Sequence, residues 1–183
     1  MRNGSGTFRN LIAGAALALV LAMPAGAGFG VGDALPDSLG KDRDGNELSL
    51  AAQHGKVVVM TFWASWCGYC LQELPILESL QRRVGKEHIE VVAINVDKHY
   101  RDFIALRRRL KDFELDITRD ANEHLADAYG VKGLPHMVLV DKQGRMAFTH
   151  VGYSEKSLPN FVNEINGLLN ENVVAAHAQA TAR

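Results

Sequence analysis

The sequence predicts an α/β fold in which a central mixed β-sheet, preceded by a β-hairpin, carries helices on both faces. Two long apolar runs rich in β-branched residues are typical of strands buried on both faces. Amphipathic segments follow each of them, and two late strand-like runs joined by a tight turn predict an antiparallel end to the sheet. With 183 residues, of which 47% are hydrophobic, the chain fits one compact domain.

The first elements are a hairpin and a buried strand. Residues 35–50, LPDSLGKDRDGNELSL, place two modest apolar segments around Asp44-Gly45, a dipeptide typical of tight turns. Residues 56–64, KVVVMTFWA, form a continuous β-branched and aromatic run, which predicts a strand buried on both faces. This strand leads directly to the two cysteines of the chain.

Helices and one more buried strand follow the cysteines. Leucines recur every three residues here, so we expect a helix from Cys67 to about Val84, kinked at Pro75. Residues 89–96, IEVVAINV, predict the second buried strand. Residues 100–113 have the pattern of an amphipathic helix.

The last third of the predicted domain closes the sheet. A short helix is expected over residues 121–130, where Gly130 ends it. Residues 136–141 and 145–152 predict an antiparallel hairpin, and residues 157–170 predict a final helix.

The N-terminal residues 1–27 have the layout of a secretory signal. Two arginines precede an apolar run of 13 residues from Leu11 to Met23, and a small-residue triplet ends at Ala27. Because a bilayer-spanning helix needs about 20 apolar residues, we expect cleavage after Ala27, with an uncleaved membrane anchor as the alternative. The remaining chain then divides into a domain over residues 28–170 and a flexible tail over residues 171–183.

Charge gives little indication of a polyanionic partner. The 20 basic and 21 acidic residues give a formal net charge of −1. No global field attracts nucleic acid or an anionic membrane, so we expect no nucleic-acid partner. We also expect a monomer without a bound cofactor or metal.

The two cysteines, Cys67 and Cys70, lie where the first buried strand meets the first long helix. A disulfide that encloses two residues stabilises a fold little, and a structural zinc site needs four ligands. Unpaired N–H groups at a helix N-terminus favour a thiolate, which makes Cys67 the expected nucleophile. Cys70 lies one turn further along the same face, so it should be more buried and able to form an exchangeable disulfide with Cys67.

These residues carry a family resemblance. FWASWCGYCLQELP, residues 62–75, resembles the active-site segment of thioredoxin-fold proteins, in particular the exported TlpA/ResA-like thiol-disulfide oxidoreductases. The resemblance covers roughly residues 32–169 and includes YGVKGLPHMVLVDKQGR. It implies a thioredoxin-like fold and a cis-proline loop at Leu134-Pro135, which would face the cysteines across a substrate groove.

The resemblance also implies roles for the residues around the cysteines. We expect the substrate to contact five of them: Trp66, Gly68, Tyr69, Leu134 and Pro135. The Gly-Tyr dipeptide is similar to that of periplasmic disulfide isomerases, so reductase, oxidase and isomerase directions stay open.

Proton transfer requires a further group. Ordinary thioredoxins carry an aspartate six residues before the first cysteine, where this chain has Thr61. Glu73 matches the glutamate of TlpA/ResA-like proteins, which implies that it takes the proton of Cys70; the alternative is a solvated helix glutamate. His136 follows the proline loop, and it either tunes the thiolate or points away.

The sequence therefore predicts an exported thiol-disulfide oxidoreductase, periplasmic or otherwise outside the cytoplasm, that reduces selected protein disulfides. The resemblance implies cytochrome c maturation as one pathway and a membrane thiol relay as the electron donor. A protein of another class is the alternative, namely one that binds or delivers copper through Cys67 and Cys70, with or without His136.

Overall fold

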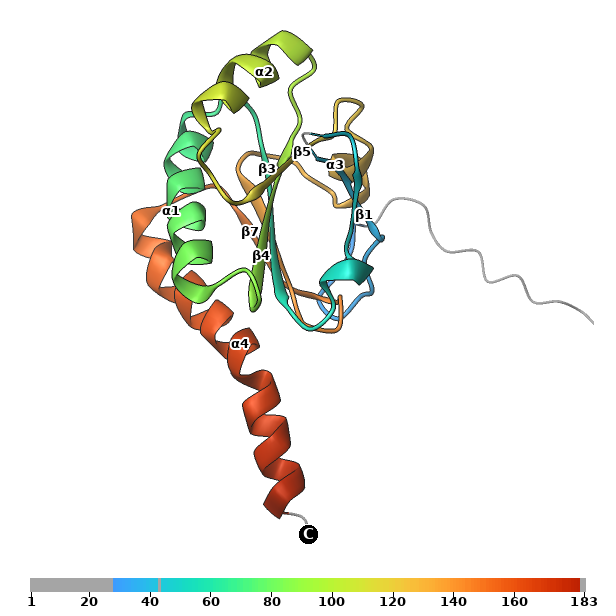
Figure 1. Cartoon of the computed structure of the whole chain (residues 1–183), viewed down its shortest axis with the longest axis vertical. Helices are drawn as coiled ribbons and strands as arrows, with labels where there is room; N and C mark the ends of the chain where they lie inside the picture. The colour runs from blue at the N-terminus through green and yellow to red at the C-terminus, as the bar shows by residue number, and fades with distance from the viewer. Residues whose placement is uncertain (1–27, 43, 182–183) are drawn as a thin grey trace, which may run out of the picture.

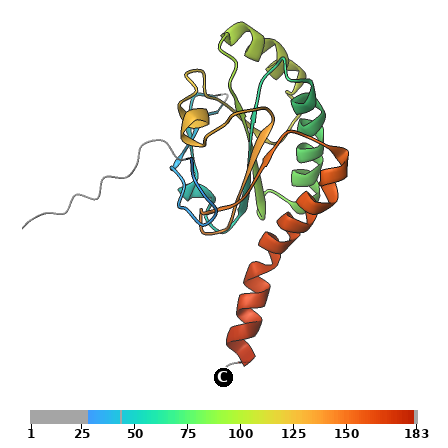
Figure 2. The same cartoon turned by 180° about the vertical axis from the view of Figure 1, so that it is seen from behind.

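The computed structural model describes residues 28–42 and 44–181, so the signal predicted for residues 1–27 lies outside the described part. The described strands form one mixed sheet in the order β2-β1-β5-β4-β3-β6-β7. Helices cover both of its faces (Figures 1 and 2). The predicted class, an α/β thioredoxin-like fold with an N-terminal hairpin, is confirmed.

Three central strands of the sheet are parallel, and the strands on either side are antiparallel. The strands are β1 (Ser38–Lys41), β2 (Glu47–Ser49), β3 (Val57–Trp63), β4 (Ile89–Asn95), β5 (Asp116–Arg119), β6 (His136–Val140) and β7 (Met146–Val151). Both long runs predicted as buried strands, β3 and β4, are buried at every position.

The helices follow the predicted order. They are α1 (Gly68–Val84), α2 (Tyr100–Arg109), α3 (His124–Ala128) and α4 (Leu158–Thr181), with 3-10 turns η1 (Ala51–Gln53) and η2 (Glu155–Ser157). α2 ends before residue 113, its predicted end, because the chain turns at Leu110 toward the next strand. Among the described helices, none combines the length and apolar character needed to cross a bilayer.

Strand β5 is absent from the predicted elements. Its four residues, DITR, are too few and too polar to show a strand pattern of their own. The strand forms because Ile117 pairs with Ala93 of β4, and Arg119 pairs with Lys41 of β1. The predicted hairpin thereby joins the sheet through β5.

The core has two layers, one on each face of the sheet. In β3, Val57, Val59 and Trp63 pack in the layer under α1, α2 and α4. The alternate residues pack in the other layer, with α3 and the N-terminal segment. Both cysteines belong to the first layer.

The C-terminal helix α4 continues to Thr181, past residue 170, where its end was predicted. Figure 1 shows its last turns extending beyond the sheet. The flexibility expected for residues 171–183 stays a prediction.

Candidate active site

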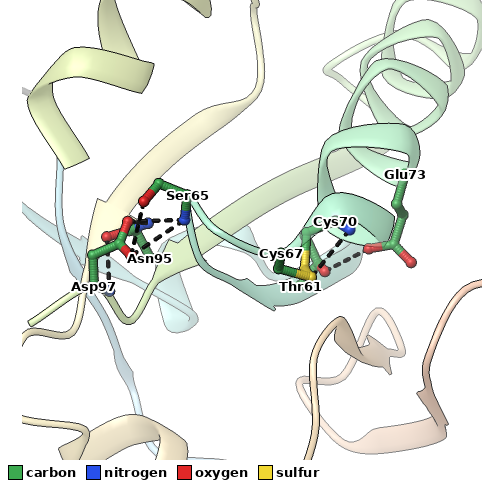
Figure 3. The surroundings of a disulfide bond; sticks show 7 residues. All are labelled: Thr61, Ser65, Cys67, Cys70, Glu73, Asn95 and Asp97. Carbon is green, nitrogen blue, oxygen red and sulfur yellow. Dashed lines mark hydrogen bonds between the residues drawn. A yellow bond between two sulfur atoms is a disulfide. The ribbon is translucent and has the colours of Figure 1, made fainter. Parts of the chain in front are cut away.

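The two cysteines form a disulfide at the start of α1, with their Cα atoms 5.3 Å apart (Figure 3). Cys67 is the N-cap residue of the helix, and its sulfur accepts a hydrogen bond from the Cys70 backbone N–H at 3.2 Å. Cys67 keeps 7% of its surface exposed and Cys70 keeps none. The predicted order of burial is therefore correct, although Cys67 is less open than a freely exposed thiol.

The active-site turn, residues 64–67, connects β3 to α1. The backbone N–H of Cys67 closes it by donating to the carbonyl of Ala64 at 3.1 Å. Two aromatic side chains next to the disulfide are largely exposed, Trp66 at 75% and Tyr69 at 61%. Gly68 begins α1, and no heavy atom would lie within 4 Å of a Cβ there. A partner can thus reach the disulfide over an aromatic surface.

The proline loop lies at the same end of the sheet as the cysteines. The Leu134-Pro135 peptide bond is cis, as predicted. The next residue, His136, begins β6 and pairs with Phe62, just before the active-site turn. A groove of about 460 Å³ lies next to the turn and this loop. Trp66 and Leu134 line it together with residues from the segment after β4 and from around α3, and neither cysteine lines it. Such a groove can hold a segment of another polypeptide.

Glu73 is buried one turn beyond Cys70, with 3% of its surface exposed. Its carboxylate accepts a hydrogen bond from the Thr61 hydroxyl at 2.7 Å (Figure 3). Burial raises the pKa of Glu73 to about 7, and the hydrogen bond from Thr61 opposes this rise only in part. The alternative of a solvated helix glutamate is therefore wrong. A carboxyl group with this pKa can accept or release a proton near neutral pH.

Thr61 has a role that the sequence did not reveal. Thr61 occupies the position of the thioredoxin aspartate, so the sequence alone indicates only that the aspartate base is missing. In the structure it is the hydrogen-bond donor that orients Glu73. Thr61 of β3 and Glu73 of α1 together therefore form a candidate acid-base group.

His136 points away from the disulfide. It lies beside Phe62, with ring centroids 6.2 Å apart, in the core layer opposite the cysteines. Its Nε2 is 3.1 Å from the Thr149 hydroxyl, and burial lowers the pKa of His136. Side chains alternate between the faces of a strand, so this residue is not placed to join Cys67 and Cys70 in a copper site.

A further group of polar residues holds the active-site turn. Ser65 in the turn bonds the buried carboxylate of Asp97, which also accepts a bond from Asn95 (Figure 3). The prediction missed these three residues. Polar residues directly after the apolar run of β4 were the available indication, since the carboxyl ends of parallel strands are where such folds place their sites.

Comparison with known proteins identifies the family of this chain. The redoxin family matches residues 30–165 of this chain. Thiol-disulfide oxidoreductase ResA from Geobacillus thermodenitrificans is 32% identical over 116 residues, which are 63% of this chain and 66% of that protein. ResA from Bacillus subtilis is 26% identical over 137 residues, which are 73% of this chain and 75% of that protein.

Solved structures agree in fold. A crystal structure assigned to a thiol:disulfide interchange protein, DsbE, of Chlorobium tepidum has a TM-score of 0.72 and 30% identity, covering 77% of this chain and 99% of that chain. The exposed lipoprotein thioredoxin Etrx1 of Streptococcus pneumoniae has a TM-score of 0.58 and 30% identity, covering 68% and 96%. These relatives support an oxidoreductase. The chain belongs to the redoxin family, within which it is a TlpA/ResA-like protein of the thioredoxin fold.

Proposed function

We propose that this thiol-disulfide oxidoreductase is exported and reduces selected protein disulfides through Cys67 and Cys70. The observation that carries the proposal is the disulfide at the N-terminus of α1, with Cys67 at the surface end and Cys70 fully buried. Helix N–H groups stabilise a thiolate at Cys67 once the bond is reduced. The buried sulfur of Cys70 then serves as the resolving thiol.

In the first step the Cys67 thiolate attacks one sulfur of the client disulfide. A bond forms between Cys67 and that sulfur, the client S–S bond breaks, and the other client sulfur leaves as a thiolate that takes a proton from water. The product is a mixed disulfide between the two proteins.

In the second step Cys70 resolves this mixed disulfide. Glu73 accepts the proton of the Cys70 thiol, and the resulting thiolate attacks the sulfur of Cys67. The Cys67–Cys70 bond forms and the second client sulfur leaves as a thiolate. Two electrons have passed to the client, and this protein is oxidised to the state in the structure. A membrane thiol relay is the proposed donor that reduces it again.

The groove beside the disulfide is the proposed client site. Two of the five expected client contacts, Trp66 and Leu134, line this groove, and Gly68, Tyr69 and Pro135 are proposed to contact the client next to it. The turn at a cis proline leaves backbone groups free to pair with an extended client strand. Because Cys67 is only 7% exposed, a client must fit this surface closely, which favours selected proteins over thiols in general.

Export rests on the sequence of the first 27 residues. The apolar run and the small residues at Ala25 to Ala27 support cleavage and release to the periplasm, where cytochrome c maturation is a candidate pathway. The exported protein should begin at Gly28, which intact-mass measurement would establish. A retained Met1 in the membrane fraction would instead establish an uncleaved anchor.

Reduction of insulin by the purified protein with dithiothreitol as the electron source tests the proposed activity, and titration of the reduced protein with cuprous ion tests the copper alternative. We expect faster insulin reduction than with dithiothreitol alone, and loss of that acceleration in both single cysteine variants. Tight one-to-one binding of cuprous ion without insulin reduction would favour the copper protein.

A further inference from the structure

A buried carboxylate holds the active-site turn from the neighbouring strand. Asp97, two residues beyond β4, is 3% exposed. The backbone N–H of Ser65 donates to its two oxygens at 3.2 and 3.0 Å, and the Ser65 hydroxyl donates to one of them at 3.1 Å (Figure 3). Ser65 is two residues before Cys67, so these bonds fix the middle of the turn that presents the nucleophile.

Asp97 is itself held from several directions. The Asn95 side chain donates to its carboxylate at 2.9 Å and accepts from its backbone N–H at 3.1 Å. Between them, the Val96 N–H bonds the carbonyl of Trp63 at 2.9 Å, which joins the ends of β4 and β3. The Arg119 guanidinium bonds the backbone carbonyl of Asp97 at 2.9 Å. The carboxylate is therefore a rigid support and not a mobile surface group.

The negative charge of Asp97 lacks a direct counter-ion. Within the described residues, no Lys, Arg or His side chain forms an ion pair with this carboxylate. Neutral N–H and O–H donors satisfy it instead. Other charged or titratable groups border the adjoining groove, namely the Lys98–Glu123 pair at 3.7 Å and the side chains of His99, Asp102, Asp127 and Lys132. They are more exposed than Asp97, so solvent screens them more than it screens Asp97. The half-buried Arg119 guanidinium bonds the backbone carbonyl of Asp97 and not its carboxylate.

We propose that Asp97 is a positioning residue for thiol exchange, which acts through Ser65 to hold Cys67 and whose charge makes the dithiol a stronger reductant. The charge argument follows from electrostatics: Asp97 bonds Ser65, two residues before Cys67 in the same turn, and a negative charge held at this turn disfavours a thiolate there. A couple whose reduced form is less stabilised gives up electrons more readily. The inference rests on the proposed function, in which Cys67 is the attacking thiol.

The test compares three variants. Asp97→Asn keeps the shape and one acceptor oxygen but removes the charge. Ser65→Ala removes one bond and keeps the charge. Asp141→Asn is the matched control, because that carboxylate also accepts from backbone N–H groups, at 2.9 Å, but in the β6–β7 turn at the other end of β6.

Two measurements separate charge from position. For charge, we expect Asp97→Asn to move the equilibrium with glutathione about tenfold toward the reduced dithiol, and to lower the pH at which Cys67 becomes reactive to iodoacetamide. To test the positioning role, insulin reduction is measured at a pH where Cys67 is ionised. We expect the rate of Asp97→Asn to be roughly 10- to 100-fold lower than that of the wild type. Ser65→Ala should slow insulin reduction less and leave the glutathione equilibrium in place. Asp141→Asn should change neither.

Equal behaviour of Asp97→Asn and Asp141→Asn in both measurements would overturn the proposal. If Asp97→Asn does not fold, an unchanged insulin rate in Ser65→Ala would overturn it, and a slowed rate would support the positioning role. The glutathione and iodoacetamide measurements need no protein client. A wild-type protein that exchanges with glutathione but leaves insulin oxidised would therefore contradict the proposed function, while these two measurements would still decide the effect of the Asp97 charge.

Discussion

Glu73 places a buried carboxyl group one turn of α1 beyond Cys70, and its pKa of about 7 is the consequence of that burial. If it takes the proton of Cys70, Glu73→Gln should slow insulin reduction at least tenfold at and above neutral pH, where the wild-type carboxyl is ionised. The difference should shrink below neutral pH, where that carboxyl is protonated. Stopped-flow rates from pH 6 to 9 measure this, and equal rates across that range would rule out the role.

Glu73 should also make stability depend on pH. Its folded pKa, about 7, lies above the ordinary value of 4.5, so the native state holds the proton more tightly than the unfolded chain does. The stabilisation is complete below about pH 4.5 and is lost as pH rises through 7. Relative to Glu73→Gln, the wild-type free energy of unfolding should fall by about 3 kcal/mol over this interval. Urea unfolding of the oxidised proteins would show it, and parallel curves for the two proteins would refute the burial argument.

The roles of single residues could be predicted where the local sequence around them was sufficient. The spacing of Cys67 and Cys70 indicated a redox pair and the relative burial of the two thiols, and the resemblance singled out Glu73. The partners of these residues could not be found in this way. Thr61 of β3 bonds Glu73 of α1, and Asp97 after β4 bonds Ser65 in the turn after β3. Spacing in the sequence does not show these pairs, because the packing of β3 against β4 and α1 brings them together.

Among the elements, α1 is tied to the start of β5 by a second buried glutamate. The carboxylate of Glu78 accepts from the backbone N–H of Glu114 at 3.0 and 2.9 Å and from that of Leu115 at 3.1 Å. Glu78→Ala should lower the free energy of unfolding by about 3 kcal/mol, because buried N–H groups lose a charged acceptor. Glu114→Ala is the control, since that side chain is exposed and its ion pair to Arg82 spans 3.7 Å; it should cost less than about 1 kcal/mol. Equal losses in urea unfolding would contradict this account.

Elements with a strong pattern of their own could be predicted, and β5 could not. The apolar runs of β3 and β4 and the leucine spacing of α1 are local features of the sequence. Strand β5 depends on partners on both sides, β4 and β1, which lie far from it in the chain. For the same reason the hairpin was predicted as a unit, while its place at the edge of the sheet was not.

In the whole molecule, three features meet at one end of the sheet: the disulfide at the start of α1, the cis-proline loop before β6 and the polar residues after β4. The groove of about 460 Å³ is lined by Trp66 next to the disulfide, by Leu134 of the proline loop and by Asp97 after β4. Its position follows from the strand order, because β3 lies between β4 and β6. The element order predicted the type of sheet and the end that carries the site, but the shape of the groove depends on side-chain packing.

Trapping of the mixed disulfide tests the central claim most directly. Cys70→Ala and Cys67→Ala variants, expressed in the native compartment, would be analysed by non-reducing electrophoresis and mass spectrometry of covalent adducts. We expect Cys70→Ala to accumulate adducts with client proteins that reductant releases, because the resolving thiol is gone, and Cys67→Ala to give almost none. Adducts that form with Cys67→Ala instead would reverse the assignment of the two thiols, and adducts with neither variant would contradict exchange with protein clients.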